Sequence, residues 1–161
     1  MSGSRENKSV AKWVEVGYSE AMQRVLLSGE FDHTLDAKGR VTLPARYREY
    51  FQHGAVLVRL HEDEPCIRVY HPDAWAEFDA KYIEPLNVFE NPKDSWRTRK
   101  IYKNQDFVEP DRLGRVVLPS KRIKELGLSG KVKIIGNRTH LEIWDPETYE
   151  ALEAEQGGGH A

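Results

Sequence analysis

The sequence of 161 residues contains a single cysteine, Cys66, so no disulfide can form within the chain. A disulfide-bonded secreted scaffold is therefore excluded, and a reducing compartment is expected. Cys66 begins the apolar run 66–70, and a lone cysteine in such a run is typical of a small buried hydrophobic residue rather than a nucleophile.

Long hydrophobic runs are also missing. No stretch approaches the roughly 18 consecutive apolar residues that a membrane-spanning helix needs. Charged residues interrupt every short apolar run in residues 1–20, which argues against a secretory signal. At 39% hydrophobic and 31% charged residues, the composition is that of an ordinary globular protein. We therefore expect a cytoplasmic protein without a membrane partner.

The usual signatures of enzyme chemistry are absent. The six histidines show no His-Glu-x-x-His or His-x-His spacing, and the single cysteine cannot form Cys-x-x-Cys. His61 and Cys66 are close in sequence, but two candidate ligands are too few for a metal site. No Gly-rich phosphate loop, Gly-x-Ser-x-Gly motif or dinucleotide fingerprint occurs. His33, near Asp36, lies on an alternating segment, where a surface or hydrogen-bonded histidine is commoner than a catalytic base. We expect no catalytic residue, metal, cofactor or small-molecule substrate.

The charge is small in total and uneven along the chain. A net charge of −2 and a pI near 6.3 give by themselves little reason to expect a nucleic-acid partner. However, residues 93–103 contain five bases and one acid, whereas residues 142–155 contain six acids and no base. A basic surface and an acidic one can therefore coexist on this chain. For the acidic segment, a solvated helix face is the alternative interpretation.

The most informative feature is an internal repeat. The segment DAKGRVTLPARYREYF, from Asp36, returns as DRLGRVVLPSKRIKEL from Asp111, 75 residues later. The segment IRVYHPDAW, from Ile67, returns as LEIWDPETY from Leu141, 74 residues later. A one-residue difference in length therefore falls in the connection between the two matches, where it costs little. The chain contains two copies of one structural unit.

Each copy begins with a pattern typical of two short strands. Phe31, His33 and Leu35 alternate with polar residues, as a half-buried strand does. A tight turn follows, and Val41 and Leu43 then alternate again. The first part of the unit is therefore predicted to be strand, turn and strand.

A short helix is expected next, with Pro44 and Pro119 at its first position, where the missing N–H is harmless. Its apolar residues share one helical face: Tyr47, Tyr50 and Phe51 in the first copy, and Ile123 and Leu126 in the second. A hairpin and a terminal helix complete the unit, with Asp145-Pro146-Glu147 as a helix start. The predicted fold class is mainly β with short helices, an α+β fold.

These patterns divide the chain into five parts. They are an N-terminal extension at 1–24, expected to be poorly ordered, a first module at 28–73, a helical linker at 74–103, a second module at 105–148, and a C-terminal helix end with a disordered tail at 149–161. Within the linker, the helix is predicted from Lys93 to Tyr102, after Asn91 and Pro92.

Two matching turns carry the most distinctive chemistry: Asp36-Ala37-Lys38-Gly39-Arg40 and Asp111-Arg112-Leu113-Gly114-Arg115. The glycines are expected to have positive φ, and the aspartates to accept backbone N–H groups, so we assign these four residues, Asp36, Gly39, Asp111 and Gly114, to the structure of the turn. Each arginine leaves the turn on a rigid tip, where its five-donor guanidinium suits phosphate oxygens or a guanine edge. The alternative is structural, with Arg40 folded back onto Asp36 and Arg115 onto Asp111.

The Asp-x-x-Gly-Arg turn followed by apolar-x-Leu-Pro, present twice, resembles the MraZ family, bacterial proteins with two AbrB-like (SpoVT-AbrB) swapped-hairpin domains. The resemblance covers about residues 25–153 and is most specific in LDAKGRVTLPARYRE and EIWDPETYE. It implies two modules packed as a pseudo-dimeric split β-barrel, in chains that assemble into a homo-oligomeric ring. The N-terminal extension departs from the family's usual start near Met22, which makes Met22 a candidate alternative start.

The resemblance also implies a function. Family members are nucleoid-associated transcriptional regulators that bind short repeated boxes in double-stranded DNA, upstream of their own operon of cell-division and cell-wall genes. Lys38 and Arg40 match the family's DNA-binding motif in the first copy, and Arg115 matches it in the second. Arg112 lies where the pattern is looser, and we include it as a fourth DNA-binding candidate.

Two other functions stay open. AbrB-like folds also serve as antitoxins or interaction modules that neutralise a toxin protein, usually through a disordered tail, which the short glycine-rich end disfavours. A structural ring scaffold is the third, and a gel shift with upstream DNA distinguishes it from a regulator.

Overall fold

The computed structural model describes residues 25–157, and every structural statement below refers to this range. The first copy contains β1 (Glu30–Thr34), β2 (Arg40–Thr42), the 3-10 turn η1 (Ala45–Tyr47), α3 (Arg48–Phe51), β3 (Ala55–Val58), β4 (Ile67–Tyr70), α4 (Pro72–Phe78) and its π-helical continuation η2 (Asp79–Ile83). The linker helix α5 (Pro92–Lys103) leads to β5 (Gln105–Val108), β6 (Arg115–Val117), α6 (Ser120–Leu126), β7 (Lys131–Gly136), β8 (Leu141–Trp144) and α7 (Pro146–Gly157). The predicted order of elements is confirmed in both copies.

Several predictions concern the ends of the chain. The extension at 1–24, the alternative start at Met22 and residues 158–161 lie outside the described residues. Gly157, which the sequence analysis placed in the tail, is the last residue of α7.

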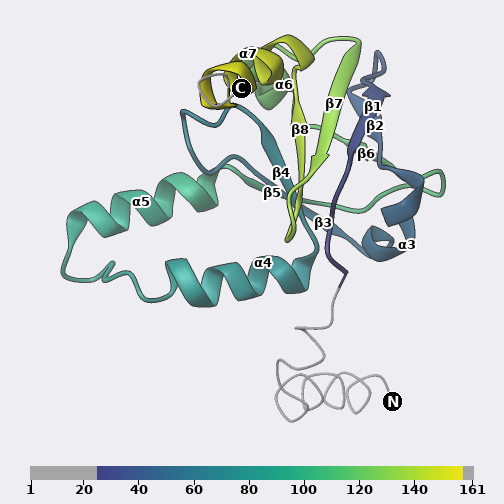
Figure 1. Cartoon of the computed structure of the whole chain (residues 1–161). Helices are drawn as coiled ribbons and strands as arrows, with labels where there is room; N and C mark the ends of the chain where they lie inside the picture. Colours follow the sequence, from purple (N-terminus) through teal and green to yellow (C-terminus); the bar gives the residue numbers. More distant parts are fainter. Residues whose placement is uncertain (1–24, 158–161) are drawn as a thin grey trace, which may run out of the picture.

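The strands form a six-stranded antiparallel sheet in the order β1-β7-β8-β4-β3-β5 and a separate two-stranded ribbon, β2-β6 (Figure 1). The first strand of each copy pairs with the hairpin of the other copy, β1 with β7 and β5 with β3. The two hairpins meet through β4 and β8 at the centre of the sheet. This is the mainly β, α+β fold that the sequence predicted, with hairpins exchanged between the copies and with β1 and β5 at the sheet edges.

The register shows that the two copies are related by an approximate two-fold axis. Val41 pairs with Val116 in the ribbon, and these residues are 75 positions apart, the spacing of the repeat. Arg68 pairs with Glu142 at the centre of the sheet, and these residues are 74 positions apart. Equivalent residues therefore face each other at both places, as they would across the axis of a symmetric dimer.

The change of length between the copies is larger than the sequence comparison indicated. Leu57 pairs with Val69 in the first hairpin, and Ile134 pairs with Ile143 in the second. Leu57 and Ile134 are therefore equivalent at a spacing of 77, while Val69 and Ile143 are equivalent at 74. The second copy gains two residues before its hairpin and loses three in the hairpin turn. The two changes nearly cancel, so the sequence comparison saw one residue.

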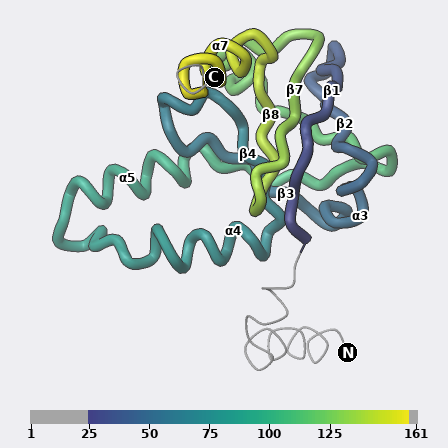
Figure 2. The backbone as a smooth tube through the Cα atoms, in the orientation of Figure 1, coloured from purple at the N-terminus to yellow at the C-terminus, as the bar shows by residue number. Residues whose placement is uncertain are grey.

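The main core lies between the large sheet and the ribbon. Val41 and Val116 are completely buried there, together with Leu43, Phe51 and Ile134. A second apolar cluster joins α4 to the sheet through Tyr70 and Trp75, whose ring centroids are 5.2 Å apart. The helices α4, η2 and α5 project from the sheet as a pair of helical segments, which we call the arm (Figure 2).

One detail of the short helices differs from the prediction. Pro44 and Pro119 have ψ angles of 135° and 132°, so both are extended and precede the first helical residue instead of occupying it. Their carbonyl oxygens accept hydrogen bonds from the backbone N–H groups of Tyr47 and Arg122, both over 2.9 Å. The prolines therefore cap the helices, because the extended conformation carries the chain out of the ribbon.

Other local predictions are confirmed. The side chain of Asn91 caps α5 by accepting from the backbone N–H groups of Lys93 and Asp94. Gly127 ends α6 with φ of 63°, a left-handed conformation that suits glycine. Cys66 is buried, with 1% of its surface exposed. Within residues 25–157, none of the helices has both the length and the apolar character needed to span a bilayer.

Candidate nucleic-acid interface

The β2-β6 ribbon presents one face to the core and the other to solvent. Because side chains alternate along a strand, burial of Val41 and Val116 places their neighbours on the opposite face. That outer face carries Arg40 and Thr42 from β2, and Arg115 and Val117 from β6. The ribbon therefore brings together the arginines of the two sequence repeats.

The first turn is held by the carboxylate of Asp36. Its Oδ1 accepts from the backbone N–H groups of Lys38 and Arg40, both over 2.9 Å. Its Oδ2 accepts from Nε of Arg40 over 2.7 Å. Gly39 has φ of 78°, a conformation that a residue with Cβ adopts only at a cost.

The second turn repeats this arrangement. Oδ1 of Asp111 accepts from the backbone N–H groups of Leu113 and Arg115, both over 2.9 Å, and Oδ2 accepts from Nε of Arg115 over 2.6 Å. Gly114 has φ of 80°. Both arginines thus fold back onto the aspartate of their own turn through one nitrogen.

Each turn is also fixed by the other copy. The carbonyl oxygen of Gly114 accepts from the N–H of Leu43, and the carbonyl oxygen of Gly39 accepts from the N–H of Leu118, both over 2.8 Å. Both leucines are buried in the core. The positions of the turns therefore depend on the ribbon and not on local contacts alone.

The charges of the two turns are partly compensated. Hydrogen bonds from the backbone N–H and then the side chain of Arg40 lower the pKa of Asp36. The backbone N–H of Arg115 lowers the pKa of Asp111 in the same way, so both carboxylates are ionised at neutral pH. Each arginine uses only Nε in its ion pair, and within residues 25–157 the terminal nitrogens of both guanidinium groups have no hydrogen-bond partner. They can still donate to a ligand.

The other two predicted residues lie in the turns themselves. Lys38 and Arg112 are exposed and have no ion-pair partner in the described part of the chain. The strands are antiparallel, so the two turns are at opposite ends of the three-residue ribbon. Arg40 and Arg115 are diagonal neighbours, separated by two residues, or about 7 Å, along the ribbon.

Sequence analysis did not identify Thr42 and Val117 as part of this surface. They lie opposite Arg115 and Arg40 respectively, on the same outer face. The signal was the alternation itself, because each of them is two residues after an arginine and next to a buried valine.

No catalytic or metal arrangement involves the histidines that we considered. His33 is half-buried, and burial followed by the nearby charge of Arg48 lowers its pKa. His61 is not part of the group with metal-like spacing that occurs among the described residues, which comprises Glu64, Cys66 and Glu142 within 4.8 Å.

The donors of that group are already engaged. The carboxylate of Glu64 is bound by Nε and a terminal nitrogen of Arg68, at 2.8 and 3.1 Å. The carboxylate of Glu142 accepts from side chains of its own hairpin. Burial, and then the charge of Glu142, raises the pKa of the Cys66 thiol, which keeps it protonated. The group therefore serves the packing of the sheet.

Comparison with known proteins agrees with this geometry. The sequence model of a family described as "MraZ protein, putative antitoxin-like" matches residues 26–95 and 101–157, most of the chain. The chain belongs to the MraZ family. The family match spans both copies of the repeat and both Asp-x-x-Gly-Arg turns.

Individual relatives in the family are similar over most of their length. The chain is 38% identical over 124 residues to a protein of Burkholderia cenocepacia, covering 74% of this chain and 82% of the relative. It is 33% identical over 123 residues to a protein of Thermomicrobium roseum, with coverage of 76% and 84%. It is 30% identical over 142 residues to a protein of Chlorobaculum parvum, with coverage of 81% and 85%. All three relatives are named transcriptional regulator MraZ.

Proposed function

We propose that this chain is a DNA-binding transcriptional regulator that acts at the promoter of the cell-division and cell-wall gene cluster. The observation that carries the proposal is the pair of arginines, Arg40 and Arg115, on the outer face of one short ribbon. The major groove of B-DNA admits a two-stranded β-ribbon. The relatives' names support the regulatory role.

In this proposal the four basic residues of the turns have different tasks. Arg40 and Arg115 keep two terminal nitrogens each for a guanine edge or a phosphate, while their Nε atoms stay on Asp36 and Asp111. Lys38 and Arg112 are exposed at opposite ends of the ribbon and suit phosphates on either side of the contacted bases. The DNA target would be the short repeated boxes upstream of the chain's own operon.

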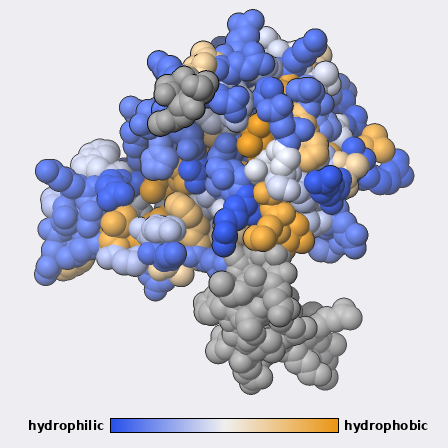
Figure 3. Space-filling view, in the orientation of Figure 1, coloured by the Kyte–Doolittle hydropathy of each residue, from blue (hydrophilic) through white to orange (hydrophobic). Residues whose placement is uncertain are grey.

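The proposal includes self-assembly into a homo-oligomeric ring and association with the nucleoid. Large apolar side chains of the arm and the loop within it support an interface there. Figure 3 shows apolar side chains on the arm among polar ones. Phe89 is 93% exposed, and Val88 beside it is 48% exposed. Side chains of this size on a surface mark contacts with another molecule more often when they are adjacent.

A gel shift with DNA from upstream of the chain's own gene tests the proposal. We expect retardation of this DNA at protein concentrations that leave a scrambled duplex of equal length free. Equal retardation of both duplexes, or of neither, would count against a sequence-specific regulator. The second of these results is the one that a purely structural ring scaffold predicts.

The antitoxin alternative is favoured by one observation, the antitoxin-like wording of the family description. It makes a different prediction, namely that a toxin protein encoded beside the chain's gene is inhibited by the purified chain. Specific binding to upstream DNA without inhibition of such a neighbour would favour the regulator. We assign no reaction to this chain, because the relatives are named as regulators.

A further inference from the structure

A basic cavity lies between the arm and the second copy, away from the ribbon. It has a volume of about 490 Å³ and is formed by the end of α5, by α6 and by the loop between β3 and β4. Six basic and two acidic side chains line it, which leaves four positive charges in excess. The whole chain has a net charge of −2, so this concentration of positive charge is local.

The deepest positive charges are fixed in place. The side chain of Arg122 is only 9% exposed, and it donates to Asn104 and to the carboxylate of Glu125. The same carboxylate lies 3.9 Å from Arg59, which also donates to the backbone carbonyl of Glu62 over 2.9 Å. Two guanidinium groups therefore share one carboxylate. Nε of Arg122 is buried and has no hydrogen-bond partner among the described residues.

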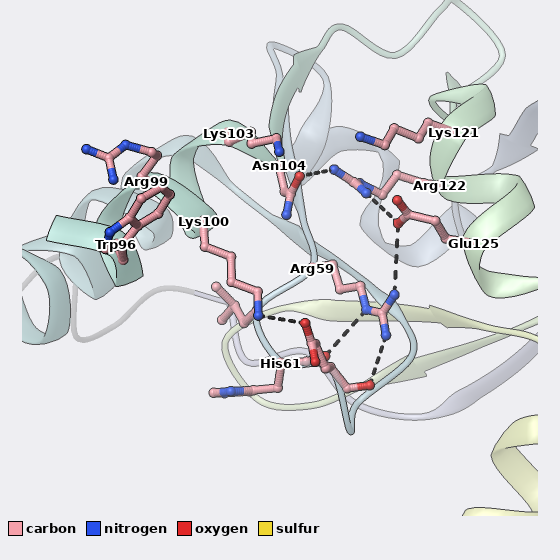
Figure 4. Close-up of a pocket in the computed structure, with 12 residues that line it drawn as sticks. Arg59, His61, Trp96, Arg99, Lys100, Lys103, Asn104, Lys121, Arg122 and Glu125 are labelled. Carbon is pink, nitrogen blue, oxygen red and sulfur yellow. Dashed lines mark hydrogen bonds and ion pairs between the residues drawn. The ribbon is translucent and has the colours of Figure 1, made fainter. Parts of the chain in front are cut away.

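The positive charges at the rim are less compensated. Lys100 forms an ion pair with Glu62 over 2.7 Å, which accounts for the second acidic side chain. Lys103 of α5 and Lys121 of α6 have no carboxylate within ion-pair distance in the described part of the chain. In Figure 4, Lys121 and Arg122 extend from α6 toward the end of α5, where Lys103 lies. The cavity thus combines a fixed cationic floor with two mobile cationic side chains above it.

We propose that this cavity binds a small anion that carries several phosphate groups. Its volume is in the range of small-ligand sites, about 300–1,000 Å³. An excess of four positive charges is matched better by a polyphosphate than by a single carboxylate. The guanidinium groups would stay on Glu125 and strengthen the field, while Lys103 and Lys121 would contact the phosphate oxygens directly.

The same phosphate chemistry could come from the DNA backbone, but the position of the cavity favours a small ligand. The cavity is recessed, with Arg122 almost completely buried at its floor. In Figure 1, α5 and the β2-β6 ribbon lie on opposite sides of the molecule. A duplex held by Arg40 and Arg115 would therefore be on the far side from Lys103.

Isothermal titration calorimetry with sodium tripolyphosphate tests the proposal, at an ionic strength of about 0.15 M. The test variant is Lys103→Gln/Lys121→Gln. The matched control is Lys93→Gln/Lys124→Gln, which removes the same charge from exposed positions on the same two helices, outside the cavity. Melting temperatures of both variants show whether the fold is intact.

We expect the wild-type chain to bind tripolyphosphate, and the test variant to bind it at least about tenfold more weakly, as the loss of charge-assisted hydrogen bonds predicts. The control should stay within about twofold of the wild type. Absence of binding to the wild type, or equal weakening in both variants, overturns the proposal.

Binding of upstream DNA distinguishes the two sources of phosphate. The test variant and the control should bind this DNA equally well if the cavity takes a small ligand. A loss of DNA affinity confined to the test variant makes the cavity a contact for the DNA backbone and overturns the small-ligand proposal. If no variant and no wild-type chain binds DNA specifically, the function proposed above fails, while the calorimetry still decides on the cavity.

Discussion

Arg40 and Asp36 form an ion pair within a single turn, with Nε of the arginine 2.7 Å from Oδ2 of the aspartate. Arg115 and Asp111 form the equivalent pair at 2.6 Å. The structural alternative for these arginines, in which they lock the turn, is therefore compatible with the observed geometry. It does not compete with a DNA contact, because the ion pair uses one nitrogen and orients the rest of the guanidinium. We expect one side chain to serve both purposes.

Arg40→Ala should abolish specific DNA binding and leave the oligomer intact, while Arg115→Ala should weaken binding. If Arg40 contacts a phosphate, the slope of log K against log salt should become shallower by about 0.9. If it contacts a base, discrimination between boxes should fall by about 1–3 kcal/mol with little change in slope. DNA affinity, oligomer mass and melting temperature should be measured on one preparation.

The control for this prediction is Asp36→Asn, which keeps Arg40 but weakens its ion pair. If the arginine serves only the turn, both variants should lose stability, assembly and DNA binding together. If it contacts DNA, Arg40→Ala should lose affinity far more than Asp36→Asn does. A folded Arg40→Ala oligomer with wild-type affinity would rule out the DNA contact.

Substitution of the turn glycines should reduce stability unequally. Both have positive φ, so Gly39→Ala and Gly114→Ala should each cost about 1–3 kcal/mol in backbone strain. A Cβ on Gly114 would also lie 2.6 Å from Cδ of Arg48, whereas one on Gly39 would lie 3.3 Å from Cδ1 of Ile123. We expect Gly114→Ala to be the more destabilising by about 1 kcal/mol, the lower end for forced repacking.

Urea unfolding measures this difference, and a second substitution identifies its cause. Arg48 is held near Gly114 by a hydrogen bond from its Nε to the carbonyl oxygen of Leu43, over 3.1 Å. In an Arg48→Ala background the extra loss at Gly114 should disappear, because the obstructing side chain is gone. Persistence of the extra loss would show that steric contact with Arg48 is not its cause.

Local structure was largely predictable from the sequence, because it depends on neighbouring residues. The repeat, the tight turns, the hairpins and the linker helix all follow from alternation, glycine position and helix caps, as Asn91 and Gly127 illustrate. Pro44 and Pro119 were misplaced by one residue, since proline fixes φ but leaves ψ open between helical and extended values.

Relations between distant segments were harder to predict. Periodicity alone does not show that β1 pairs with the hairpin of the other copy, and the exchange was expected only from the family resemblance. The outer face of the ribbon depends on the pairing of Val41 with Val116, which lies outside any local pattern. The basic cavity was half visible, because the charge run at 93–103 supplies one wall and Lys121 and Arg122 come from a helix 18 residues further on.

Self-assembly should depend on the arm. Native mass spectrometry should find a closed oligomer of the wild-type chain, and Phe89→Ser should shift the population toward smaller species, because 93% of this side chain is exposed. Glu90→Ser, at the next position of the same loop, is the control and should leave the oligomer unchanged. A clean monomer of the wild-type chain at micromolar concentration would contradict assembly itself.

A buried carboxylate should give the fold a specific sensitivity to acid. Burial tends to raise the pKa of Glu142, but hydrogen bonds from His140, Asn137 and Trp144 outweigh it and lower the pKa from 4.5 to about 2. Each of these three contacts is 3.0 Å long. Because the pKa is lower in the folded chain, the ionised carboxylate stabilises the fold above about pH 4.5, and this stabilisation is lost as the pH falls toward 2.

Urea unfolding at pH 5.5 and pH 3 should detect this loss as about 2 kcal/mol more destabilisation in the wild-type chain than in Glu142→Gln, whose side chain does not titrate. Other carboxylates also lose charge over this interval, so the difference between the two chains, and not the total change, is the quantity to compare. Glu155→Gln, at an exposed position of α7, is the matched control and should keep the wild-type pH dependence. If Glu142→Gln and Glu155→Gln lose the same stability between the two pH values, the hydrogen bonds to Glu142 do not favour its ionised form.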